Sequence, residues 1–199
     1  MVRIFNISPY DIKVPERVIA ARMGFKGLGK IPDEFKDVYE KVHESALKIS
    51  KPVVVVDDYA VLVENEEIKI DEIEIPGNLA RSQLKKSVKI SILLATLGSE
   101  IDEEISRLHK NGKEVESFAL DAIGSEMIEF AVRYVDGMLR NETELKGSAR
   151  ISPGYADLPI SLNLWFYKKL GNYISVRCNG ESFTFVPRKT ISAFIGWSN

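Results

Sequence analysis

Residues 88–102 read VKISILLATLGSEID, and the expected fold is built around this stretch. Residues 88–96 form an almost uninterrupted aliphatic run, which is typical of a strand buried on both faces. Gly98 ends the run. Ser99 then offers a helix start, because its hydroxyl can accept a hydrogen bond from the backbone N–H three residues on. We therefore predict a central strand that leads at once into a helix ending near Lys110.

The segments around this strand mix the two kinds of secondary structure. Helical patterns occur at residues 14–23, 32–49, 77–86, 99–110, 114–140 and 160–170. The β-branched run at 52–63 predicts two short strands separated by a turn at Asp57-Asp58, and residues 68–75 predict a strand with a bend near Asp71-Glu72. Because no regular strand–helix–strand repeat is present, the pattern favours an α+β fold.

The glycine-rich run GFKGLGK at residues 24–30 has the composition of a phosphate-binding loop. Such a loop must follow a buried strand and open a helix whose N–H groups point at the phosphates. No strand is expected before this run, and the Walker spacing is absent. We interpret the run as a turn.

Composition argues against several classes of partner. The 27 basic and 29 acidic residues are interspersed, whereas proteins that bind duplex nucleic acid usually carry a basic face. The apolar runs fall far short of the ~20 residues that a membrane-spanning helix needs. Cys178 is the only cysteine, which suits a reducing compartment, and His43 and His109 lack metal-ligand spacing. We expect a cytoplasmic protein that uses no nucleic acid, no membrane and no metal site of its own.

The longest expected helix, at residues 114–140, carries a carboxylate on its apolar side. The apolar stripe consists of Val115, Phe118, Ala119, Ala122, Ile123, Met127, Phe130, Ala131, Tyr134, Val135 and Met138. Glu126 projects from this stripe, and the charged face with Glu129 and Asp136 is expected to be solvated. Because a buried, unpaired carboxylate is costly, Glu126 needs a partner, either an Arg or Lys of the protein or a cationic group of a ligand.

The run ARISPGYADLP at residues 149–159 is the best candidate for a ligand site. Ser152-Pro153-Gly154-Tyr155 predicts a type II turn, because Pro153 fixes φ and Gly154 tolerates a positive φ. Arg150 brings a forked donor suited to a carboxylate, and Tyr155 brings a flat face and a hydroxyl. Together they suit a small zwitterion with an aromatic base. Taken alone, they favour a simpler interpretation, a rigid turn that leads into the next helix.

Four stretches together resemble the activation (reactivation) domain of cobalamin-dependent methionine synthase. R-x-S-P-G-Y at residues 150–155 resembles the R-x-x-x-G-Y motif with which that family binds S-adenosylmethionine (AdoMet). The others are ATLGSEID at 95–102, Ser125-Glu126-Met127, and the C-terminal Glu181-Ser182-Phe183 with VPRKTISA at 186–193. The resemblance covers roughly residues 90–197.

The resemblance implies a fold and a site. The fold would be α+β, a twisted, largely antiparallel sheet with surrounding helices, in a single domain over residues 1–199; residues 1–86 diverge and 87–199 carry the motifs. The AdoMet site would consist of Glu126, Arg150, Ser152, Gly154 and Tyr155. Arg150 would bind the methionyl carboxylate and Glu126 the methionyl amine, so these two side chains should face one pocket. The backbone at Ser152 and Gly154 would contact the ligand, and Tyr155 would line the pocket.

The resemblance also implies a function without a catalytic residue in this chain. The protein would be a reactivation subunit that presents AdoMet to cobalamin carried by a methionine synthase lacking its own activation domain. A flavodoxin-like donor would supply the electron that converts cob(II)alamin to methylcobalamin. The chain would thus act as part of a methyltransferase.

Two alternatives stand beside this function. The first is an activation-like binding module that serves another corrinoid protein or has lost AdoMet binding. The second is an independent AdoMet methyltransferase, which is disfavoured because no Rossmann glycine motif follows a first strand.

Overall fold

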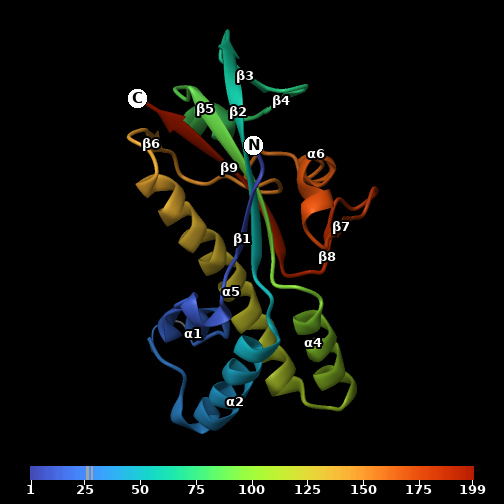
Figure 1. The fold of residues 1–199 in the computed structure, drawn as a ribbon. Helices are drawn as coiled ribbons and strands as arrows, with labels where there is room; N and C mark the ends of the chain where they lie inside the picture. Colours follow the sequence, from blue (N-terminus) through green and yellow to red (C-terminus); the bar gives the residue numbers. More distant parts are fainter. Residues whose placement is uncertain (26, 28) are drawn as a thin grey trace.

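The computed structural model describes residues 1–25, 27 and 29–199 and has the predicted α+β fold (Figure 1). The helices are α1 (Glu16–Arg22), α2 (Asp33–Ile49), α3 (Asn78–Leu84), α4 (Glu100–Lys110), α5 (Glu114–Asn141) and α6 (Leu162–Leu170), with 3-10 turns η1 (Pro9–Asp11) and η2 (Gly171–Tyr173). The strands are β1 (Arg3–Asn6), β2 (Val53–Glu64), β3 (Glu67–Ile70), β4 (Ile73–Glu74), β5 (Lys89–Thr96), β6 (Lys146–Gly147), β7 (Arg177–Cys178), β8 (Phe185–Val186) and β9 (Thr190–Ser198).

β5 is the central strand of the main sheet, as predicted. It pairs with β2 on one side and with β9 on the other, both antiparallel, and the strand order is β4-β3-β2-β5-β9-β6. β1 pairs with the first part of β2, so it adds a strand beside β3 on the same edge of β2. The two-residue strands β7 and β8 form a separate small sheet.

Helices cover both faces of the sheet, and each face has its own hydrophobic core. α5 crosses one face, where Leu93 of β5 and Ile195 of β9 are buried with Ile123 of α5. α6 covers the opposite face, where Phe166 packs against Phe194 with ring centroids 4.6 Å apart. α1, α2 and α4 surround the first half of α5, at the end of the molecule away from the β2–β3 arm (Figure 1). Because β5 is buried on both sides, its backbone and side chains hold the two layers together.

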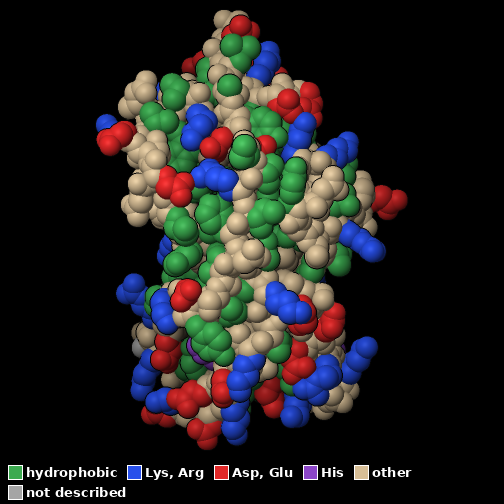
Figure 2. Space-filling model, in the orientation of Figure 1, with side chains coloured by type: hydrophobic (Ala, Val, Ile, Leu, Met, Phe, Trp, Pro, Cys, Tyr) green, Lys and Arg blue, Asp and Glu red, His purple; other side chains and the backbone are tan. Residues whose placement is uncertain are grey.

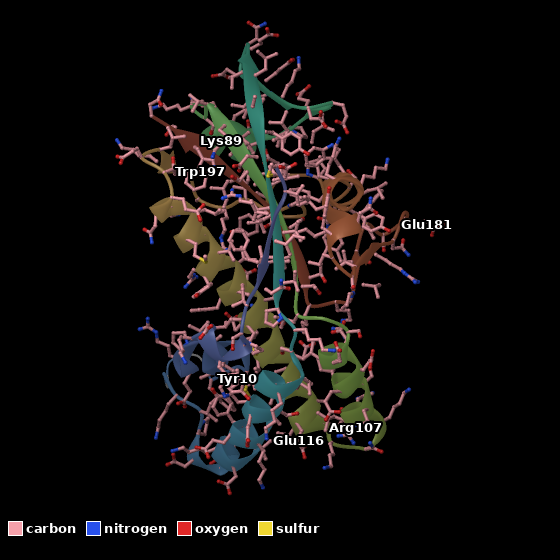
Figure 3. All side chains as sticks on the ribbon, in the orientation of Figure 1. Tyr10, Lys89, Arg107, Glu116, Glu181 and Trp197 are labelled. Carbon is pink, nitrogen blue, oxygen red and sulfur yellow. The ribbon has the colours of Figure 1, made fainter. Side chains whose placement is uncertain are left out.

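The predicted turn at Asp57-Asp58 is wrong, because β2 continues through both residues. The Asp58 carboxylate is half-buried and accepts hydrogen bonds from Arg3, Lys89 and Ser91. These partners satisfy a charge that would otherwise disfavour a position in the sheet. Figure 3 shows Lys89 close to Trp197, and its ammonium lies 5.5 Å from the centre of the Trp197 ring.

The predicted bend and glycine-rich turn are both present. Asp71 has a positive φ of 48° and joins β3 to β4 as a tight hairpin. Gly24, Gly27 and Gly29 all have positive φ, which fits a turn; the parts of that prediction at Lys26 and Leu28 lie outside the described residues.

Surface charges of both signs are interspersed over the helical end of the molecule formed by α1, α2 and α4 (Figure 2). Within the part of the chain that the structure describes, no helix has the length and apolar character needed to cross a membrane. His, Cys, Asp and Glu side chains of the same residues form no cluster of three or more that could hold a metal.

Candidate functional site

The ARISPGYADLP segment runs along the outer edge of β9. Ile151 pairs with Phe194, with hydrogen bonds of 3.1 and 2.9 Å in the two directions. The Tyr155 N–H donates to the Ser152 carbonyl over 3.2 Å, and Gly154 has φ of +85°. The hydrogen bond across the turn and the positive φ at its third residue are those of the predicted type II turn.

Asp157 fixes the far end of the segment to α3. Its carboxylate accepts hydrogen bonds from the backbone N–H groups of Asn78 and Leu79, at 2.6 and 3.1 Å. Gly77 precedes the helix with φ of +101°, and a Cβ there would lie 2.9 Å from the Asp157 carboxylate. The hydrogen bonds from Asn78 and then Leu79 lower the pKa of Asp157. The loop is therefore held at both ends, by β9 and by α3.

Arg150 is a largely buried cation with only distant partners. Its side chain is 18% exposed; Nη2 lies 3.7 Å from Glu129 Oε2, and Nε lies 4.0 Å from Asp136 Oδ2. The guanidinium makes no hydrogen bond to any residue that the structure describes. Burial lowers the pKa of Arg150, while the nearby carboxylates of Glu129 and Asp136 oppose this effect. The side chain remains a cation with free donors.

Arg140 explains why Asp136 does not bind Arg150 more closely. The Arg140 Nε donates to Asp136 Oδ1 over 2.8 Å, and its two terminal nitrogens donate to the carbonyls of Gly147 and Ser148. Arg140 therefore neutralises Asp136 and fixes the chain that leads to Arg150. The α5 face with Glu129 and Asp136, which we expected to be solvated, instead faces this segment.

A pocket of about 220 Å³ lies between α5 and the edge of β9. Glu129 lines it from α5, Arg150 and Ser152 from the loop, and Ile191 and Ala193 from β9. The Arg150 guanidinium and the Glu129 carboxylate thus line one pocket together with the apolar side chains of Ile191 and Ala193. Such an arrangement suits a zwitterion, whose carboxylate would meet Arg150 and whose ammonium would meet Glu129.

The expected pairing of Arg150 with Glu126 at this pocket is wrong. The Glu126 side chain is 10% exposed and forms an ion pair with Arg22 of α1, and it is not among the residues that line the pocket. The carboxylate that lines the pocket with Arg150 is Glu129, three residues further along α5. The alternative that Glu126 is paired within the protein therefore describes this structure.

The remaining predicted residues divide between the pocket and its surroundings. Ser152 lines the pocket. The Gly154 N–H donates to the Leu158 carbonyl over 2.8 Å, so this donor is used within the loop. The Tyr155 side chain is 70% exposed and offers a free aromatic face next to the turn.

Of the other stretches of the resemblance, VPRKTISA contributes Ile191 and Ala193 to this pocket, whereas ATLGSEID lies elsewhere. Thr96, Gly98, Ser99 and Glu100 of ATLGSEID line a hollow of about 620 Å³ on the α6 face of the sheet, where Glu100 pairs with Lys51. The expected side-chain cap from Ser99 is not formed, although α4 begins where predicted.

Comparison with known proteins supports the fold. No protein-family model and no curated protein matches the chain. Among solved structures, the chain is similar to the crystal structure of the MetH reactivation domain bound to AdoHcy, with a TM-score of 0.72 and 14% sequence identity. The similarity covers 98% of this chain and 78% of that one. This chain has the fold of the MetH reactivation domain. The predicted resemblance is thereby confirmed for the fold.

On this reactivation-domain fold, sequence reasoning missed Glu129. Glu129 lies seven residues before Asp136 and four after Ser125, so all three share one face of α5. The available signal in the sequence was this row of polar residues along one face of α5. The spacing alone did not show whether this face of α5 packs against the 149–159 loop or is exposed to water.

The ion pair between Arg22 and Glu126 generates a prediction about stability. Arg22→Ala should lower the free energy of unfolding by roughly 2–4 kcal/mol, because it leaves a buried carboxylate unpaired. Arg17→Ala, an exposed position on the same helix, should change it by no more than about 0.5 kcal/mol. Adding Glu126→Gln to Arg22→Ala should recover part of the loss. Urea unfolding measures all four proteins, and equal losses for Arg17→Ala and Arg22→Ala would contradict the assignment.

Asp157 generates a prediction about pH. Its folded-state pKa is lowered, so the ionised carboxylate stabilises the fold above the pKa of the unfolded chain. That contribution is lost as the pH falls through the lower folded pKa. The difference in free energy of unfolding between the wild type and Asp157→Ala should therefore be present at pH 7 and shrink as the pH falls below the ordinary pKa of an aspartate, about 3.9. A difference that stays constant over this range would show that the carboxylate charge does not hold α3.

Proposed function

We propose that this chain binds AdoMet in the pocket beside Arg150 and serves as a reactivation subunit for a cobalamin-dependent methionine synthase. The observation that carries the proposal is the Arg150 guanidinium, which is largely buried and keeps its donors free opposite Glu129. A buried cation without hydrogen-bonded partners is costly in the free protein and is suited to an anionic ligand group. The MetH reactivation domain, whose fold this chain shares, has been crystallised with AdoHcy.

The residues at the pocket fit the amino-acid end of AdoMet. Arg150 would bind the methionyl carboxylate through two N–H donors, and Glu129, in place of Glu126, would accept the ammonium. Ile191 and Ala193 offer an apolar floor for the methylene groups next to sulfur. The exposed ring of Tyr155 offers a stacking surface for the adenine, which extends beyond a pocket of this volume.

The chain's contribution to the reaction is positioning. AdoMet would supply a methyl group that, with one electron from a flavodoxin-like donor, converts the partner's cob(II)alamin to methylcobalamin and leaves AdoHcy. Arg150 and Glu129 would fix the methionyl end, so that the sulfonium methyl group is held towards the partner. No acid or base is required in this chain, because no proton is transferred.

Calorimetric titration with AdoMet tests the site. Arg150→Ala should weaken binding by about 1.5–3 kcal/mol, or roughly 10- to 150-fold in Kd, because it removes charge-assisted hydrogen bonds. Glu129→Gln should weaken binding in the same direction. Glu126→Gln is the matched control, with a similar change three residues away, and should leave the affinity unchanged.

Three outcomes would contradict this assignment. A loss with Glu126→Gln but not with Glu129→Gln would restore the carboxylate expected from sequence. Unchanged affinity in Arg150→Ala would remove the loop motif from the site. Folded wild-type protein that gives no binding heat would favour a module that has lost AdoMet binding.

The partner is tested by adding the chain to a cobalamin-binding methionine synthase that lacks its own activation domain. With AdoMet and a reduced flavodoxin, the cob(II)alamin absorbance should disappear at a rate that depends on the added chain, and Arg150→Ala should slow it. If AdoMet binds but the cobalamin is not methylated, the result would favour the alternative in which the chain serves another corrinoid protein.

A further inference from the structure

A second polar pocket, of about 340 Å³, lies between the last turn of α3 and the paired ends of β6 and β9. It shares no lining residue with the pocket of Arg150. It also lies on the other face of the sheet, because Leu84 of α3 belongs to the hydrophobic core under α6. This pocket takes no part in the function proposed above.

The lining of this pocket carries positive charge only. Lys85 and Lys86 line it from the end of α3 and Lys146 from β6, and no Asp or Glu is part of the lining. None of the three forms an ion pair with the residues that the structure describes, whereas Lys48 and Lys51, which lie elsewhere in the molecule, do. The C-terminal carbonyls of α3 add a partial negative charge of at most ~0.5, which is smaller than the positive charge of three ammonium groups. The pocket is therefore a site of positive potential.

Ser87 supplies a free hydroxyl within this positive pocket. Its side chain is 8% exposed and lines the pocket, and its hydroxyl makes no hydrogen bond to the described residues. Gly196 of β9 leaves the space for it, because a Cβ at this position would overlap Ser87 Oγ. The hydroxyls of Ser148 and Ser198 donate to the carbonyls of Ala149 and Lys146, so they are used within the protein. The Ser87 hydroxyl is open to the pocket, so the oxygen of an anionic ligand could accept a hydrogen bond from it.

We propose that this pocket binds the phosphate group of a phosphate monoester. Three ammonium groups from two segments of the chain, together with the unpaired hydroxyl of Ser87, match the charge and the several acceptor oxygens of a phosphate. The volume is roughly ten times the ~30 Å³ share of one water molecule, which leaves room for a small organic group attached to the phosphate.

The test uses the full chain labelled with ¹⁵N and titrated with glycerol 3-phosphate at low ionic strength. The amide signals of Ser87, Gly147 and Gly196 should shift saturably. The triple variant Lys85→Gln/Lys86→Gln/Lys146→Gln should weaken the affinity by roughly tenfold or more, because it removes the charge-assisted hydrogen bonds. Ser87→Ala, which leaves the charges in place, should weaken it by a smaller factor.

The matched control removes the same charge elsewhere. Lys36→Gln/Lys41→Gln/Lys110→Gln replaces exposed lysines of α2 and α4 that form no ion pair among the described residues. It should leave the affinity nearly unchanged. If both triple variants lost affinity equally, the binding would reflect a general attraction of anions to the protein and not this pocket. If the wild type showed no saturable shifts, the proposed site would be wrong.

A phosphate monoester can be a soluble metabolite or a lipid headgroup, and a second arm separates them. Co-sedimentation with vesicles that contain phosphatidic acid is compared with the titration by glycerol 3-phosphate. Binding in either arm that is lost in the Lys85/Lys86/Lys146 variant supports the site and identifies the source of the phosphate. Binding in neither arm overturns the proposal.

Discussion

The pairing of β5 on both of its edges is the constraint on which the rest of the structure depends. All of its residues after Lys89 are buried, and its ladders with β2 and β9 satisfy backbone groups that water cannot reach. Both faces must then be covered, which fixes α5 on one side and α6 on the other. It also requires the C-terminal strand β9 to return beside β5 and under the middle of α5. There the buried Lys189 ammonium binds Asp121 and Ser125 of α5, both at 2.8 Å, and so joins the sheet to the helix.

The candidate AdoMet pocket exists because β9 has a mostly free outer edge. Only β6 and the bridge at Ile151 pair with this edge among the described residues, and the chain between them spans Ser148 to Arg150 without forming a strand. Arg140 donates hydrogen bonds to Asp136 and to the carbonyls of Gly147 and Ser148. These bonds place Arg150 beside α5 but leave it without a close carboxylate. The Arg150 guanidinium keeps free N–H donors because Arg140 binds Asp136 more closely than Arg150 does.

The sequence predicted features that depend on local periodicity and missed those that depend on distant partners. The helices and the central strand followed from spacing and from uninterrupted apolar runs. The turn expected at Asp57-Asp58 failed because Arg3 and Ser91, far away in the sequence, stabilise Asp58 within a strand. The choice between Glu126 and Glu129 failed for a geometric reason. Three residues on a helix differ by about 60° in direction, and spacing fixes this difference but not which neighbour either residue faces. Since α5 is covered by the sheet and by other helices, its apolar stripe did not identify the side on which the candidate pocket lies. Four large residues of that stripe, Val115, Phe118, Tyr134 and Met138, are in fact exposed.

The two pockets on this edge are separated by the alternation of side chains along β9. Ile191 and Ala193 face α5 and the Arg150 pocket, whereas Gly196 and Ser198 line the lysine pocket near α3. The segment from Lys146 to Ser152 contributes to both, and Arg140 holds its middle through the carbonyls of Gly147 and Ser148. Both pockets therefore depend on how this one segment is held against the edge of β9, by the hydrogen bonds of Ile151 with Phe194 and by the pairing of β6 with β9.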